Sequence, residues 1–190
     1  MMHRVGWMLL LAAGTACADA CRWDVREDPA VAESLLVDVA IQAPEFVDEG
    51  GALKPTIDGL SAIGKPGAPD LPKAVKLLPV PEGRFPRVEV LSIDSSVTNG
   101  VLVMPCPTPR VVESEEGKRV DTTDRTKDDA IYGKAEVWPA EPVICETAMM
   151  GTQTWARLVV HPMQYEPVSG IFIWHTNVTM RIWWEKEPKS

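Results

Sequence analysis

The end of the chain alternates apolar and polar side chains over a long stretch, and this pattern constrains the fold more than any other. The apolar positions are Phe172, Trp174, Thr176, Val178, Met180, Ile182 and Trp184. The polar positions between them are His175, Asn177, Thr179, Arg181 and Glu185. Successive side chains of a strand point to opposite faces, so the pattern predicts a strand with one face against a core. A second layer must cover that face.

The segment before this strand is predicted to be its hairpin partner. Thr152 to Met163 is rich in apolar and β-branched residues, and a short polar turn separates it from the last strand. Pro167 and Gly170 suit the two ends of a hairpin loop of about four residues. We therefore expect an antiparallel pair in which Glu166 faces Ile171.

Shorter apolar runs predict further strands. They are Leu35 to Gln42, Ala74 to Val80, Arg87 to Ile93, Val101 to Met104, Ala135 to Trp138 and Pro142 to Cys145. Gly and Pro recur from Gly50 to Pro86, which excludes long helices there. No segment has the periodicity of an amphipathic helix. The sequence therefore predicts an all-β fold, an antiparallel β-sandwich of jelly-roll type with Pro- and Gly-rich connections.

One long segment, Glu113 to Asp129, consists almost wholly of charged and small residues. Its only aliphatic residue is Val120, so we expect a solvated loop. Long loops inside compact domains are often functional, which makes this segment a candidate binding region.

The amino terminus has the order of a secretory signal peptide. Met1 to Arg4 is polar and basic, Val5 to Ala13 is apolar, and small residues follow. Cleavage after Ala18 or after Ala20 fits equally well. A third alternative is lipidation of Cys17, which follows small residues but lacks the usual aliphatic residue three positions earlier.

These features predict a signal peptide at residues 1–20, a polar segment at residues 21–33 and one β-sandwich domain at residues 34–187. The signal is of bacterial type, so we expect export to the periplasm, the outer membrane or the medium. Only a lipid anchor would attach the chain to a membrane. The net charge is -8 and no cluster of Lys and Arg appears, which argues against a nucleic-acid partner.

The cysteines leave two alternatives open. In an oxidising compartment Cys106 and Cys145 are candidates for a disulfide, with Cys21 unpaired. The other alternative is that Cys106 and Cys145 are half-buried thiols on neighbouring strands.

No complete catalytic or metal-binding site is present. His161 and His175 are the histidines left after export, and we expect both to be ordinary histidines on the surface of a sheet. The expected register places them on opposite faces of the hairpin. That disfavours a shared metal ion, and a Cys-His dyad would lack an identified third group. We therefore expect a protein that is not an enzyme and that needs no cofactor.

The tryptophans are expected mainly in the core, although a sugar-stacking platform is an alternative. Trp183 falls on the polar face of its strand and is a candidate contact surface. The second functional hypothesis is therefore a secreted or lipid-anchored module that recognises a protein or a glycan.

Three segments in the same order carry a resemblance to one family. They are Gly67 to Pro72, Tyr132 followed by Trp138-Pro139, and His161 to Gly170. From about Leu35 to Trp184 the chain is similar to the N-terminal propeptide domain of gingipain-type cysteine peptidases. The hairpin sequence beginning at Gln164-Tyr165 is the most specific piece.

The resemblance implies a β-sandwich that assists folding of the peptidase and keeps it latent by placing a basic side chain in its specificity pocket. The implied partner is the catalytic domain of a cysteine peptidase. The matching loop follows Pro105, and the candidate inhibitory residues are Arg110, Lys118, Arg119 and Arg125. This loop is longer than the family's and is rich in Glu and Asp, which would oppose entry into an acidic pocket. Solvated charges on a loop are the alternative.

The sequence ends at Ser190, shortly after the last predicted strand. We expect the domain to act on a peptidase in trans if the stop is real, and in cis if the chain continues.

Overall fold

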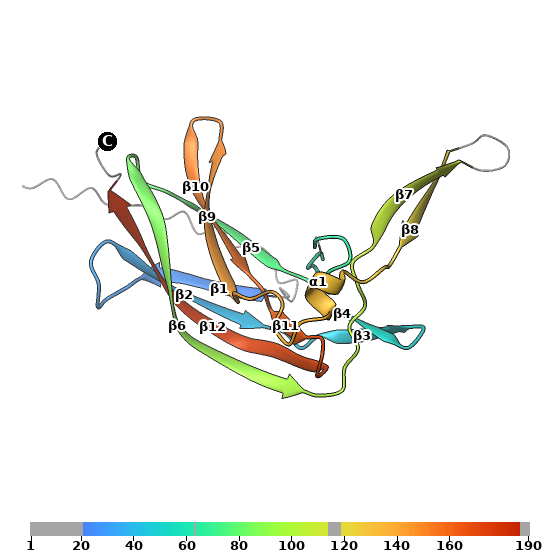
Figure 1. Cartoon of the computed structure of the whole chain (residues 1–190). Helices are drawn as coiled ribbons and strands as arrows, with labels where there is room; N and C mark the ends of the chain where they lie inside the picture. Colours follow the sequence, from blue (N-terminus) through green and yellow to red (C-terminus); the bar gives the residue numbers. More distant parts are fainter. Residues whose placement is uncertain (1–20, 63, 114–118, 187–190) are drawn as a thin grey trace, which may run out of the picture.

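The computed structural model describes residues 21–62, 64–113 and 119–186. Within these residues the chain is mostly strand, arranged in two sheets with two additional hairpins (Figure 1). Strands that pair are antiparallel throughout. The predicted all-β antiparallel fold is therefore confirmed. The signal peptide expected at residues 1–20, with Cys17, lies outside the described residues.

The larger sheet has five strands and the smaller one three. The larger sheet contains β1 (Cys21–Glu27), β2 (Ser34–Ile41), β6 (Arg84–Thr98), β11 (Met163–Glu166) and β12 (Ile171–Lys186). The smaller sheet contains β5 (Ala74–Pro79), β9 (Val143–Met150) and β10 (Gln153–Val160). The hairpins are β3 (Glu45–Glu49) with β4 (Ala52–Thr56), and β7 (Thr108–Glu113) with β8 (Arg119–Asp124).

Strand β12 organises the larger sheet, as its sequence pattern predicts. It pairs with β6 along one edge, and with β2 and β11 along the other. Val178, Met180 and Ile182 are fully buried, which confirms the predicted inward face over this part of the strand. The register against β6 shifts at Thr176, so a bulge interrupts the alternation there.

The core lies between the two sheets. Val37 and Val39 of β2 lie opposite the smaller sheet, which contributes Leu158 and Val160 of β10, and all four side chains are inaccessible to solvent. Removing this apolar surface from water is the main force that holds the two layers together. Four tryptophans pack against the same core, namely Trp23, Trp138, Trp174 and Trp184.

The hairpin before β12 differs from the prediction in one respect. Glu166 faces Ile171 as expected, but the single strand predicted from Thr152 to Met163 is divided into β10 and β11, which belong to different sheets. The break falls at Pro162, which has no backbone N–H to donate to a neighbouring strand. The chain therefore changes sheet at this point.

Three further expectations are corrected. The polar segment predicted at residues 21–33 contains β1, which pairs with β2 from Cys21 to Glu27. Ala135 to Trp138 forms no strand, although Trp138 makes an isolated bridge to Tyr165. Val101 to Met104 forms no strand either, although Val103 makes an isolated bridge to Leu53. The short helix α1 (Asp129–Tyr132) follows the hairpin of β7 and β8. Among the described residues no helix is long and apolar enough to cross a membrane.

Candidate functional site

The hairpin of β7 and β8, called the arm below, extends away from both sheets (Figure 1). Strand β8 and the last residue of β7, Glu113, fall within the segment Glu113 to Asp129 that was expected to be a solvated loop, so that expectation is corrected for these residues. Pairing runs from Thr108 opposite Asp124 to Glu113 opposite Arg119. The backbone groups that face inward on each strand pair with those of the other, and this pairing gives a largely polar segment regular structure.

The arm carries two of the four predicted inhibitory residues on its strands. Arg110 lies on β7 opposite Thr122, and Arg119 lies on β8 opposite Glu113. Lys118 lies outside the described residues. Arg125 follows directly after β8 and belongs to the base of the arm.

Residues 105–107 lead into the arm and residues 125–128 lead out of it, and together they are called the root. Both parts of the root hydrogen-bond to the segment at residues 67–70, called the socket. The Gly67 N–H donates to the carbonyl of Cys106 at 3.1 Å, and the Cys106 N–H donates to the carbonyl of Ala68 at 2.6 Å. The Asp128 N–H donates to the carbonyl of Gly67 at 2.9 Å. The socket therefore lies between the two ends of the arm.

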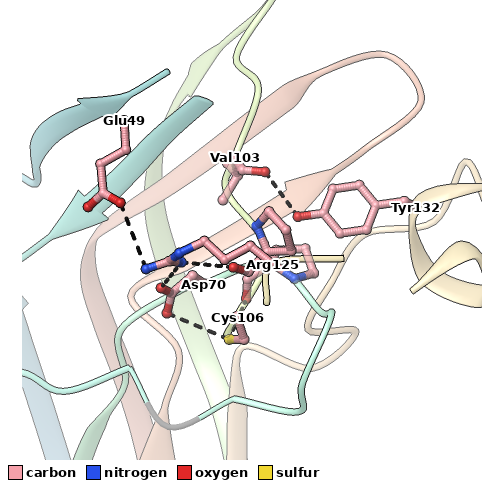
Figure 2. A network of polar contacts seen from close by, with 8 residues as sticks. Glu49, Asp70, Val103, Cys106, Arg125 and Tyr132 are labelled. Atoms are coloured by element: carbon pink, nitrogen blue, oxygen red, sulfur yellow. Dashed lines mark hydrogen bonds and ion pairs between the residues drawn. The ribbon is translucent and has the colours of Figure 1, made fainter. Parts of the chain in front are cut away.

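The side chain of Arg125 joins the root to the socket (Figure 2). Its Nη1 atom donates to Oδ2 of Asp70 at 3.3 Å and to the carbonyl of Pro105 at 2.9 Å. Its Nη2 atom lies 3.9 Å from Oε2 of Glu49, at the end of β3. The Asp70 side chain is 4% exposed and that of Arg125 is 30% exposed. A carboxylate buried to this extent requires a partner, and Arg125 is its cationic partner in the structure.

Cys106 completes the contacts of Asp70. Its thiol lies 3.6 Å from Oδ1 of Asp70 and 3.7 Å from the carbonyl of Pro69. Burial, with the nearby Asp70 carboxylate, raises the pKa of Cys106 to about 11. Cys106 and Cys145 are both free thiols in the structure, so the disulfide considered between them is not formed there. Cys145 lies on β9 and Cys106 lies in the root, so they do not occupy neighbouring strands either.

Gly67 allows the socket and the root to approach each other. Its φ angle is +79°, and a Cβ atom placed there would lie 3.0 Å from the backbone N of Asp128 and 3.0 Å from the carbonyl O of Thr126. Both atoms belong to the backbone, so neither can rotate aside. Only glycine combines this angle with this separation.

Helix α1 supports the other side of the root. Asp128 caps the helix by accepting from the N–H of Ala130, and it pairs with Nζ of Lys65 at 2.6 Å. The Tyr132 hydroxyl donates to the carbonyl of Val103 at 2.9 Å, and its ring packs edge-on against Tyr165. The contacts of Asp128 and Tyr132 thus hold the chain in place directly after the arm.

The two histidines are engaged in local hydrogen bonds. His175 is buried, contrary to the predicted surface position, with Nδ1 2.7 Å from Oγ of Ser95 and Nε2 3.0 Å from Oε1 of Gln164. Nδ1 of His161 lies 2.8 Å from the carbonyl of Glu141. In the part of the chain that the structure describes, no group of three or more His, Cys, Asp or Glu is placed to hold a metal ion.

Trp183, the candidate contact residue, is half-buried on β12, where it lies opposite Arg87 of β6 and Ser34 of β2. It therefore lies in the interior of the larger sheet, with a paired strand on each side.

Two stacked antiparallel sheets with a projecting hairpin define a β-sandwich domain (Figure 1). A family model described as Propeptide_C25 matches residues 37–190, and the chain belongs to this family, the propeptide domains of gingipain-type cysteine peptidases. No curated protein sequence matches it.

Two solved structures from Porphyromonas gingivalis have the same fold. One is described as the complex of RgpB pro- and mature domains, with a TM-score of 0.72, 18% identity and coverage of 90% of this chain and 87% of that one. The other concerns the zymogenic latency of gingipain K, with a TM-score of 0.66, 20% identity and coverage of 88% and 94%. These identities are low, so the likeness concerns the fold.

Proposed function

We propose that this chain binds a gingipain-type cysteine peptidase through the arm, blocks its active site and assists its folding. The observation that carries the proposal is a hairpin with basic residues that extends from a fixed root beyond the two sheets (Figure 1). The neighbouring structures, one of them described as a complex of pro- and mature domains, support a peptidase as the partner.

The chemistry of inhibition follows from a basic side chain entering an acidic specificity pocket. A guanidinium makes two parallel charge-assisted hydrogen bonds to a carboxylate, which gives both affinity and geometric selectivity. Arg110 and Arg119 are the described candidates on the arm, and Lys118 lies between the two strands in the sequence. The acidic residues of the same segment favour entry of one side chain rather than of the whole arm, because an acidic pocket would repel them.

A preformed arm strengthens such binding. A flexible loop loses conformational entropy when it is immobilised in a partner's cleft, whereas an already ordered hairpin loses less. We propose that the sandwich serves this purpose and has no catalytic role of its own. We also propose that the chain is exported, in keeping with the signal sequence at residues 1–20.

The test is titration of the purified chain into active gingipain-type peptidases specific for Arg and for Lys, with residual activity measured on small peptide substrates. Saturable inhibition of one specificity class supports the proposal and indicates the type of pocket. Full activity of both classes at high micromolar concentrations of the chain would contradict it. Folding assistance is measured separately, as the yield of active peptidase refolded with and without the chain.

A further inference from the structure

The guanidinium of Arg125 is already bound within the chain. It contacts three separate parts of the molecule: Asp70 in the socket, the carbonyl of Pro105 in the root, and Glu49 at the end of β3 (Figure 2). The first two contacts use the same Nη1 atom. One side chain thus ties the outgoing part of the root to both the incoming part and the socket.

The contacts described at the base of the arm hold its direction. Among the named strands and the helix, β7 and β8 pack extensively only against each other. The hydrogen bonds described between the ends of the arm and the rest of the domain lie at the root. The backbone hydrogen bonds between root and socket hold the ends of the arm together, and the buried ion pair fixes the end of β8 against the domain.

Moving Arg125 into a partner's pocket would leave Asp70 without its cation. Asp70 is almost fully buried, and among the described residues its other side-chain hydrogen bond comes from the thiol of Cys106 at 3.6 Å. The pKa of that thiol is raised to about 11, so it is neutral and a weak donor. Leaving a buried carboxylate in this state costs more free energy than leaving a surface charge unpaired. The contacts of Arg125 therefore favour a role at the root over a role in the pocket.

We propose that Arg125 is a positioning residue: its ion pair with Asp70 sets the direction of the arm and so determines how strongly the chain binds the peptidase. This inference rests on the proposed function. Loss of the pair leaves the two strands of the arm intact but lets the arm sample many directions, so that the inhibitory side chain meets the pocket less often.

The experiment measures arm direction and inhibition in the same variants. Spin labels on unnatural amino acids at positions 122 and 92 report the distance between β8 and β6 without using the native thiols. We expect a narrow distance distribution for the unmodified chain. Arg125→Gln is expected to broaden it and to weaken inhibition about tenfold, which corresponds to about 1.4 kcal/mol. Arg125→Lys keeps the charge but loses the planar guanidinium with its several N–H donors. We expect it to be intermediate in both the width of the distribution and the strength of inhibition.

Arg110→Ala and Arg119→Ala are the matched comparisons. If either residue enters the pocket, its variant loses inhibition while the distance distribution stays narrow. A narrow distribution in Arg125→Gln overturns the inference: with inhibition unchanged the pair does not position the arm, and with inhibition lost Arg125 itself contacts the peptidase. Should Arg125→Gln fail to fold, as judged by circular dichroism, Asp70→Asn breaks the same ion pair with little change of shape. A broadened distribution with weakened inhibition then supports the inference, and a narrow distribution overturns it.

The proposed function and the inference fail in different ways. If the unmodified chain inhibits no peptidase, the proposed function is wrong, yet a broadened distribution in Arg125→Gln still demonstrates that the ion pair sets the arm's direction. If the unmodified chain inhibits and Arg125→Gln inhibits equally well, only the inference is wrong.

Discussion

Arg125 and Asp70 are 55 residues apart in the sequence, and their side chains meet at 3.3 Å at the base of the arm. The pair lies between the domain, which has its own core, and the hairpin that projects from it (Figure 1). Asp70 belongs to a Gly- and Pro-rich segment that is part of the family resemblance. In the structure this segment contacts both ends of the arm. It is the socket in which the arm is held.

Single substitutions on the arm should separate the candidate inhibitory residues. The residue that enters the pocket is expected to lose about 2 kcal/mol or more of binding free energy on truncation, typical of a buried charged anchor. Inhibition constants of Arg110→Ala, Lys118→Ala and Arg119→Ala measure this, with Arg22→Ala on the exposed surface of β1 as the control. Equal inhibition by all four variants would mean that no basic arm residue anchors the complex.

Gly67→Ala should destabilise the domain because the new Cβ atom meets the backbone of Asp128 and Thr126. Gly83→Ala is the matched control, since Gly83 also has a positive φ, +65°, but nothing lies within 4 Å of its Cβ position. The control isolates the cost of the left-handed conformation, about 1 kcal/mol. We expect Gly67→Ala to lose at least about 1 kcal/mol more in urea unfolding. Equal losses would show that the root and socket move apart readily.

The thiols should all be free and slow to react. A chain that begins at Cys21 contains Cys21, Cys106 and Cys145, and the structure has all three as free cysteines. Burial raises the pKa of each to about 11, so little thiolate is present near neutral pH. We expect slow reaction with a chromogenic disulfide reagent in buffer and rapid release of three equivalents in denaturant. One equivalent instead would indicate a disulfide.

Stability should fall as the pH is lowered from about 7 to about 5. Burial lowers the pKa of both His175 and His161 below 6.5, so in this range the unfolded chain binds more protons than the folded one. The stabilisation is complete above pH 6.5 and decreases as the pH falls toward the lowered values. The Asp28 and Asp38 carboxylates, whose pKa values are also lowered, contribute only at more acidic pH.

Urea unfolding at about pH 7 and about pH 5 measures this dependence. The double substitution of His161 and His175 by Gln should flatten it, and each single substitution should flatten it in part. If the double variant shows the same pH dependence of stability as the unmodified chain, groups other than these two histidines cause it.

The local patterns were predicted well because strand pairing in hairpins depends on neighbouring residues. Glu166 faces Ile171 because a short turn with a glycine at its end fixes the register. The alternation from Val178 to Ile182 indicated a buried face, and these side chains are buried. The break at Pro162 had a visible signal, the missing N–H, but apolar residues on both sides of it resembled one continuous strand.

The arm was missed because its strands have no apolar face. Periodicity detects a strand that is half-buried, whereas β7 and β8 are held by pairing with each other and by a root that contacts a distant segment. Arg125 therefore resembled the other basic residues of the segment in sequence. The buried Asp70 that distinguishes it lies far away along the chain.

The sequence by itself determined the all-β class, the long last strand with its apolar face from Val178 to Ile182, and the turn that pairs Glu166 with Ile171, since these depend on side-chain alternation and on local Pro and Gly. Only the tertiary structure decided that β10 and β11 belong to different sheets, that a polar segment forms a projecting arm, and that Asp70 binds Arg125. These features depend on contacts between residues distant in sequence, whose free energy exists only when the whole domain has folded.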